Sequence, residues 1–208
     1  MTWGTESQPS ADIRREPAWA LVHSPCVKAD ADELRTAGRE AVERRDWDSA
    51  YELLSELETP EAEDLELAAD AALWSRHYGD VIGLLERAAA AYLQANDRYG
   101  AARMDVNLAA EHAQRGELAV ADGCGSRAAA LLEDLPESVE HARAACLLAR
   151  AALFAGDIDL LLQRADEAAA IARRVGSEDA EALAVLYRGH ALLALGRYEE
   201  GRALMDEA

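Results

Sequence analysis

The chain has 208 residues, 47 of them alanine, and a formal net charge of −19 from 40 acidic and 21 basic side chains. Alanine, leucine, glutamate and arginine favour helix, so the composition predicts an all-α fold. Duplex DNA and anionic membranes attract clustered Lys and Arg, so this charge argues against direct binding to nucleic acid or to such membranes. A basic partner or simple solubility explains the charge.

Cysteine usage and hydropathy favour a reducing cytoplasm. Cys26, Cys124 and Cys146 lie far apart in the sequence, so neither a disulfide framework nor a zinc knuckle is expected. The N-terminus lacks an apolar signal core, and no run approaches the roughly 20 apolar residues of a membrane span. We therefore expect a cytoplasmic protein without membrane attachment.

Residues 1–29 contain three of the five prolines and show no helical periodicity. This pattern is typical of an extended, partly disordered leader. We assign it no function.

From residue 30 onward the helical signals are broken by short turns, and the sequence aligns on itself as five helix–turn–helix units. The units are expected at about 30–60, 61–97, 98–135, 136–176 and 177–208. Three positions recur at spacings of 31, 40, 40 and 40 residues. They are a small residue in the first helix (Gly38, Ala69, Ala109, Ala149, Gly189), a bulky residue after the turn (Trp47, Tyr78, Leu118, Ile158, Tyr198) and a third position in the second helix (Ala50, Val81, Ala121, Leu161, Gly201).

These recurring positions predict how each hairpin packs. Small residues in both helices allow a close crossing, and the bulky residue is expected to fill the gap at the bend. Gly116, Gly156 and Gly196 fall at the turn, where a helix end commonly needs a left-handed residue. Since a lone hairpin leaves an apolar face exposed, the units must stack.

The last unit, "GHALLALGRYEEG" (189–201), resembles the tetratricopeptide repeat in its Gly189, Ala191, Gly196 and Tyr198, with Gly201 where that family usually has Ala. The resemblance covers about 30–208 and implies a right-handed superhelical stack of about five hairpins. The segments 44–56, 83–103 and 131–142 are also similar to the helical repeat region of actinobacterial LuxR/MalT-type transcriptional regulators. Arginine with almost no lysine (Lys28 alone) suits a GC-rich genome.

In that regulator family, the DNA-binding segment follows further repeats. No recognition helix is evident in residues 1–208, which end within the second helix of the fifth unit. The chain is therefore expected to be either a fragment of such a regulator or a stand-alone repeat protein.

Catalytic and metal motifs are not evident. None of the five histidines has a metal-ligand spacing. The stretch "DGCGS" (122–126) superficially resembles a phosphate-binding loop, but it follows no strand and falls inside an expected helix. We interpret Gly123 and Gly125 as close-packing points and Cys124 as a core residue. We expect no enzyme activity, no cofactor and no metal.

The concave surface is the better candidate for a site, because the first helix of each unit lines the inner groove of such stacks. Helical spacing puts a set of charged and aromatic residues on this face. Arginine forks beside an aromatic floor suit a peptide with acidic groups or a C-terminal carboxylate. The alternative is that the aromatics are packing residues and the arginines are paired with nearby acids. The candidate binding residues are Arg39, Asp70, Trp74, Arg103, Arg143, Arg150, Phe154 and His190.

The sequence therefore predicts a non-catalytic module that binds a protein or peptide, acidic at the contacting group, or that forms a homodimer. By resemblance, it would be the sensing or interaction part of a LuxR-type regulator without its DNA-binding segment. The alternatives are a stand-alone adaptor, a self-associating scaffold, or an enzyme or small-molecule carrier on a helical-repeat scaffold.

Overall fold

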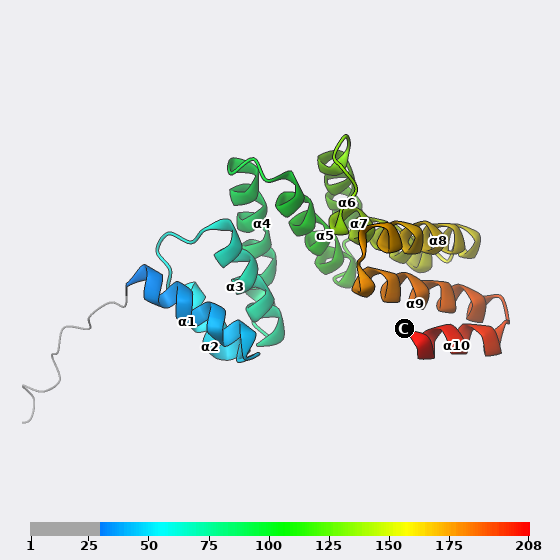
Figure 1. The fold of residues 1–208 in the computed structure, drawn as a ribbon, viewed down its shortest axis with the longest axis horizontal. Helices are drawn as coiled ribbons and strands as arrows, with labels where there is room; N and C mark the ends of the chain where they lie inside the picture. Colours follow the sequence, from blue (N-terminus) through cyan, green and yellow to red (C-terminus); the bar gives the residue numbers. More distant parts are fainter. Residues whose placement is uncertain (1–29) are drawn as a thin grey trace, which may run out of the picture. The chain divides into compact units, whose positions relative to one another are not determined.

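The computed structural model describes residues 30–208, and the predicted leader at 1–29 lies outside the described residues. The described chain is all-α, and its ten helices form five successive antiparallel hairpins (Figure 1), as predicted. The helices are α1 (Ala31–Glu43), α2 (Trp47–Ser55), α3 (Ala62–Trp74), α4 (Tyr78–Gln94), α5 (Arg98–Gln114), α6 (Leu118–Leu132), α7 (Val139–Ala155), α8 (Ile158–Val175), α9 (Glu178–Ala194) and α10 (Tyr198–Glu207).

The hairpin turns use the left-handed backbone that the glycine pattern predicts. Gly116, Gly156 and Gly196 have φ angles of 78°, 71° and 77°. In the first two hairpins Arg45 and Arg76 take the same conformation without glycine, at φ angles of 57° and 68°. A non-glycine side chain is strained at such a φ, so the glycine turns are the less costly form of the same bend.

Two of the three recurring positions form the core. The small residues of the first helices and their counterparts in the second helices are all buried. In the last hairpin a Cβ on Gly201 would lie 2.9 Å from the Gly189 carbonyl oxygen. This crossing therefore requires glycine, as the pattern predicts.

The interpretation of the bulky residue as a plug at the bend is wrong for three of the five hairpins. Tyr78, Leu118 and Tyr198 are 54%, 55% and 64% exposed. The turns are closed by backbone hydrogen bonds instead, for example from the Asp157 amide to the Ala152 carbonyl. The bulky side chains are therefore left at the surface.

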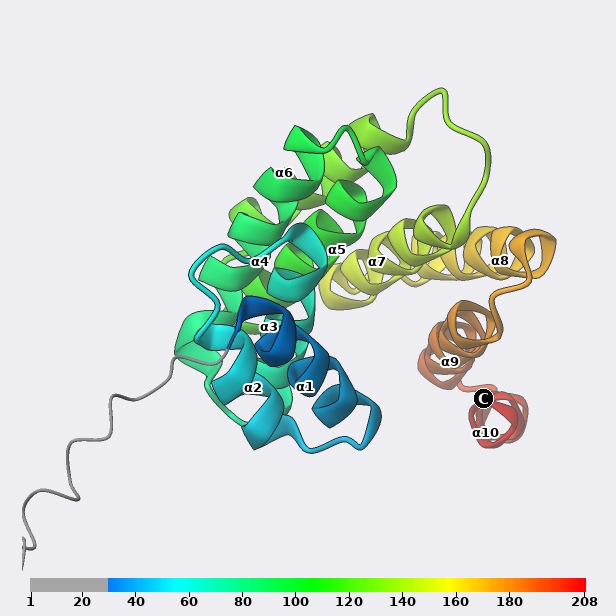
Figure 2. The same ribbon diagram turned by 60° about the vertical axis from the view of Figure 1, so that its left-hand side comes forward.

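The core is divided at the junction between α6 and α7, the helices on either side of the long loop in Figure 2. One large cluster extends from Leu54 to Cys124, and a second extends from Ala142 to Ala191. A small cluster around Val106 and Leu132 bridges them at the end near the loop.

We expect Gly201→Ala to lower the free energy of unfolding by about 1–3 kcal/mol, because the added methyl meets backbone that cannot move independently. Gly123→Ala in α6 is the control. A Cβ there meets nothing within 4 Å, so we expect a gain of up to about 1 kcal/mol from helix propensity. Thermal unfolding followed by far-UV circular dichroism measures both, and equal effects would contradict the packing argument.

Candidate functional site

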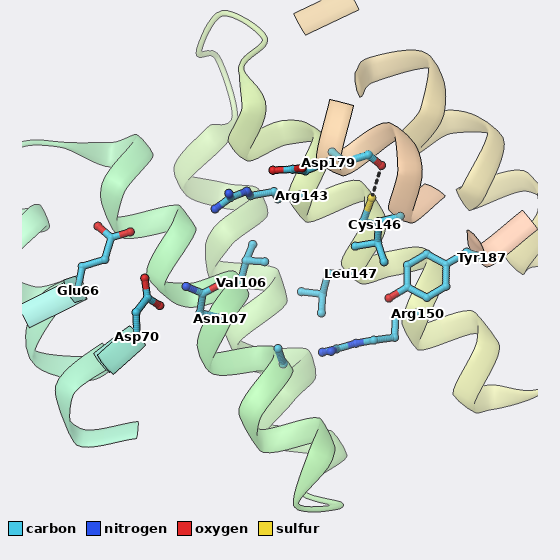
Figure 3. Close-up of a pocket in the computed structure, with 13 residues that line it drawn as sticks. Glu66, Asp70, Val106, Asn107, Arg143, Cys146, Leu147, Arg150, Asp179 and Tyr187 are labelled. Atoms are coloured by element: carbon cyan, nitrogen blue, oxygen red, sulfur yellow. Dashed lines mark hydrogen bonds between the residues drawn. The ribbon is translucent and has the colours of Figure 1, made fainter. Parts of the chain in front are cut away.

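Helices α3, α5, α7 and α9, the first helices of units two to five, surround a hollow of about 420 Å³ that we call the groove. Figure 3 shows its labelled side chains converging from these helices. Its walls carry charges of both signs beside apolar side chains. The lining residues are Glu66, Asp70, Val106, Asn107, Ala110, Arg143, Cys146, Leu147, Arg150, Asp179, Ala180, Leu183 and Tyr187.

An ion-pair network fixes the α3 side of the groove. Arg103 on α5 bonds Glu66 through Nε at 2.6 Å and Nη2 at 2.7 Å, and it reaches Glu140 on α7 at 3.1 Å. The Tyr92 hydroxyl donates to the same Glu66 carboxylate. Burial opposes ionisation of Glu66, but the hydrogen bonds from Arg103 and Tyr92 outweigh it and lower the pKa of that carboxyl. Arg103 therefore holds α3, α5 and α7 together and has little capacity left for a ligand.

Asp70 adds a second carboxylate one turn along α3. Its side chain is exposed and lines the groove, and Figure 3 shows it below Glu66. Partial burial and the neighbouring Glu66 raise the pKa of Asp70 to about 6, while Arg143 and Arg103 act in the opposite direction. The charge of this wall therefore changes near pH 6.

Two guanidinium groups on α7 face this wall without ion pairs to any described residue. Arg143 is exposed and points toward Glu66 and Asp70 (Figure 3), close enough to influence the pKa of both. Arg150 is partly buried and extends toward α5, and its Nη2 is buried without a hydrogen-bond partner. A buried donor without an acceptor costs about 1–3 kcal/mol. Both groups can therefore bind a carboxylate from outside the chain.

Four of the predicted binding residues meet here. Asp70, Arg143 and Arg150 line the groove, and Arg103 lies beside them through its bonds to Glu66. The alternative interpretation, in which the arginines are paired with nearby acids, holds for Arg103. It does not hold for Arg143 and Arg150 among residues 30–208.

The other four predicted residues lie elsewhere. Arg39 is bound to Glu63 at 3.1 Å, and His190 donates from Nδ1 to the Leu186 carbonyl at 2.9 Å. Trp74 ends α3 and stacks on Trp47, with ring centroids 6.1 Å apart. Phe154 lies in the last turn of α7 and lines a separate hollow.

Several groove residues were not predicted from the sequence, including Asn107, Cys146 and Tyr187. Their signal was present in the repeat, because they occupy positions two and three residues before the recurring small residue of the first helix. Counting back from Ala69, Ala109, Ala149 and Gly189 gives Glu66, Val106 and Cys146 in one register and Asn107, Leu147 and Tyr187 in the other.

The groove chemistry suits binding. Burial raises the pKa of the Cys146 thiol to about 11, so this thiol is protonated at neutral pH and is a poor nucleophile. Residues 30–208 contain no group of three or more His, Cys, Asp or Glu side chains placed to hold a metal ion. The "DGCGS" stretch lies within α6, as expected, and Cys124 is buried. Among the described helices, none has the length and apolarity needed to cross a bilayer.

No protein-family profile matches the sequence, and no curated protein matches it. Solved structures do match the fold. BtubC (BKLC) from P. vanneervenii has a TM-score of 0.64 at 17% identity, covering 85% of this chain and 77% of that chain.

A putative kinesin light chain of Podosopora anserina with nearly identical TPR-like repeats has a TM-score of 0.60 at 16% identity, covering 86% of this chain and 94% of that chain. A point variant of the same kinesin light chain has a TM-score of 0.61 at 16% identity, covering 85% of this chain and 93% of that chain. The described chain therefore has the fold of tetratricopeptide-like repeat proteins.

Proposed function

We propose that the groove binds an extended peptide, or an extended segment of a partner protein, through a carboxylate near α7. The observation that carries this proposal is the pair of α7 guanidinium groups, Arg143 and Arg150, which line the groove without an ion pair to any described residue. A ligand carboxylate in the groove would supply their counter-charge.

The other groove residues support a peptide over a smaller anion. The groove is lined by helices of four successive hairpins, so an extended ligand could contact several of them at once. Asn107 lies in the middle, and its amide can both donate to and accept from a peptide backbone. Leu147 and Leu183 offer apolar contact for side chains.

The experiment compares peptides from a random-sequence library, each presented once with a free C-terminal carboxylate and once as the C-terminal amide. We expect the wild-type protein to select free acids. Arg143→Glu should weaken binding of the selected peptides by tenfold or more, since a charge-assisted hydrogen bond contributes about 1.5–3 kcal/mol. Fluorescence anisotropy measures the affinity.

Arg188→Glu is the matched control, because it makes the same charge change on α9 at an exposed residue that pairs with Asp166 outside the groove. Far-UV circular dichroism checks that both variants keep their helices. Equal binding by the two variants, or equal binding of acids and amides, would overturn the proposal.

We further propose that this module is the interaction part of a LuxR-type regulator. The support is the sequence resemblance of segments 44–56, 83–103 and 131–142. The proposal requires the native gene to encode a DNA-binding helix-turn-helix after residue 208, and sequencing that gene tests it. Without that segment, the adaptor or self-associating scaffold is favoured, and size-exclusion chromatography with light scattering separates these two by mass.

A further inference from the structure

A second hollow, separate from the groove, opens between the α5–α6 hairpin and the α7–α8 hairpin. We call it the lateral cleft. It has a volume of about 560 Å³, and large apolar side chains at its mouth are exposed, with Leu118 at 55% and Phe154 at 65%. Its lining residues are Ala109, Ala113, Leu118, Ala121, Asp122, Gly125, Ser126, Ala129, Leu147, Leu148, Arg150, Ala151, Ala152, Phe154, Ala155, Leu160 and Arg164.

The cleft exists because α6 lacks side chains that its counterparts possess. At the repeat spacing of 40 residues, Asp122 stands where α4 has Ile82 and α8 has Leu162, and both of these pack against a core cluster. Gly125 stands where α4 has the buried Leu85. The volume that apolar side chains fill in α4 is therefore empty at the α6–α7 junction.

The loop between α6 and α7 is fixed to the start of α5. Arg98 donates to the Glu133 carbonyl at 2.9 Å, and the Tyr99 hydroxyl donates to the Pro136 carbonyl at 3.0 Å. The cleft reaches the ends of these helices that lie away from the loop, because Leu118 begins α6 and Phe154 lies in the last turn of α7. Most of its lining side chains are apolar.

Arg150 is the unpaired cation in the lining of the lateral cleft. It lines both the groove and the lateral cleft, and it has no ion pair with any described residue. The other cation at the cleft, Arg164, is already bonded to Glu167 at 2.8 Å. The acidic side chain of the lining, Asp122, is exposed. A hollow of a few hundred Å³ with mostly apolar walls and a few charged groups is typical of a small-molecule site.

We propose that the lateral cleft binds an aliphatic carboxylic acid, with the alkyl chain between α6 and α7 and the carboxylate on the Arg150 guanidinium. The apolar walls match the chain, and the unpaired cation matches the head group. The site is distinct from the peptide groove, although the two share Leu147 and Arg150.

The test uses three probes with one alkyl chain, namely dodecanoate, methyl dodecanoate and dodecylammonium, each below its micelle concentration. We expect dodecanoate to bind and to raise the thermal midpoint of the wild-type protein. The methyl ester should bind about tenfold or more weakly, since it cannot form the charged hydrogen bond, and the ammonium weaker still. Isothermal titration calorimetry measures the affinities.

Gly125→Leu fills the cleft with the side chain that α4 has at the same position, and it should abolish dodecanoate binding. Gly123→Leu is the matched control, because it adds the same side chain to the same helix where a Cβ meets nothing within 4 Å. Should Gly125→Leu fail to fold, Asp122→Leu fills the neighbouring position and serves the same purpose.

Equal affinity for the three probes, or unchanged dodecanoate binding in the filled variant, would overturn the proposal. Concentration-dependent dimerisation that the filled variant loses, without dodecanoate binding, would also overturn it in favour of a second copy as the occupant. Arg143→Glu should retain dodecanoate binding and Gly125→Leu should retain peptide binding, so failure at one site is distinguishable from failure at the other.

Discussion

Replacing Arg103 with alanine is expected to lower the free energy of unfolding by about 3 kcal/mol, the lower part of the range for breaking a buried ion pair. Arg103 joins Glu66 on α3 to Glu140 on α7. Its loss removes the hydrogen-bonded counter-charge of two partly buried carboxylates, and the Tyr92 hydroxyl stays bonded to one of them. Chemical denaturation monitored by circular dichroism measures the loss.

The pH dependence of this variant gives an independent check. In the wild-type protein the depressed pKa of Glu66 contributes stability that is present above the unfolded pKa and is lost as pH falls through the folded pKa. Without Arg103 that contribution disappears, so the stability deficit of the variant should be largest at neutral pH and should narrow as pH falls through the ordinary glutamate pKa of about 4.3. Arg44→Ala, which removes an exposed pair with Glu40, is the control and should change stability by less than about 1 kcal/mol. A similar loss in both variants would contradict the network.

Gly100→Ala is expected to destabilise the protein by about 2–3 kcal/mol. A Cβ at this buried position in the first turn of α5 would lie 2.4 Å from Cδ1 of Tyr92. The ring cannot move away freely, because its hydroxyl is bonded to Glu66 and the Arg103 guanidinium lies 5.5 Å from its centroid. Overpacking of a rigid core contact has this cost.

Gly79→Ala is the control, since Gly79 lies in the first turn of α4 with nothing within 4 Å of an added Cβ. It should be neutral or stabilising by up to about 1 kcal/mol. In the double variant Gly100→Ala/Tyr92→Leu, removing the ring should relieve the clash, so the combined loss should be less than the sum of the two single losses. Additive losses would show that the ring is not the obstacle.

The repeat spacing predicted the helical hairpins and the buried positions because close crossing places a strict local demand on residue size. Gly189 and Gly201 illustrate this, since each would place a Cβ against the other's carbonyl oxygen at 3.1 and 2.9 Å. The plug assigned to Tyr78 was wrong for a related reason. A bulky side chain at a recurring position marks the same point in each hairpin. It does not show whether that side chain points into the bend or toward solvent.

The groove was predictable in part. The position one residue after the recurring small residue lines the groove in three units, at Asp70, Ala110 and Arg150. Trp74 and Phe154, four residues further on, lie instead at the C-terminal ends of α3 and α7, next to the hairpin turns. Which arginines are free also depends on three-dimensional pairing, since Glu66 is 37 residues away from Arg103 in the sequence. The interpretation of Gly123 as a close-packing point was wrong, because a Cβ added there would meet no atom within 4 Å.

The divided core bears on how the protein unfolds. Residues from Leu54 to Cys124 and from Ala142 to Ala191 bury their apolar surface in separate clusters, joined by a small bridge near Leu132. In repeat arrays, cooperativity depends on the coupling between neighbouring units, and a weak interface allows one block to open while the other stays folded. A ligand bound in the lateral cleft between α6 and α7 would contact helices of both clusters at once. Its effect would be to strengthen the coupling that the cluster around Val106 and Leu132 and the Arg103–Glu140 ion pair already provide.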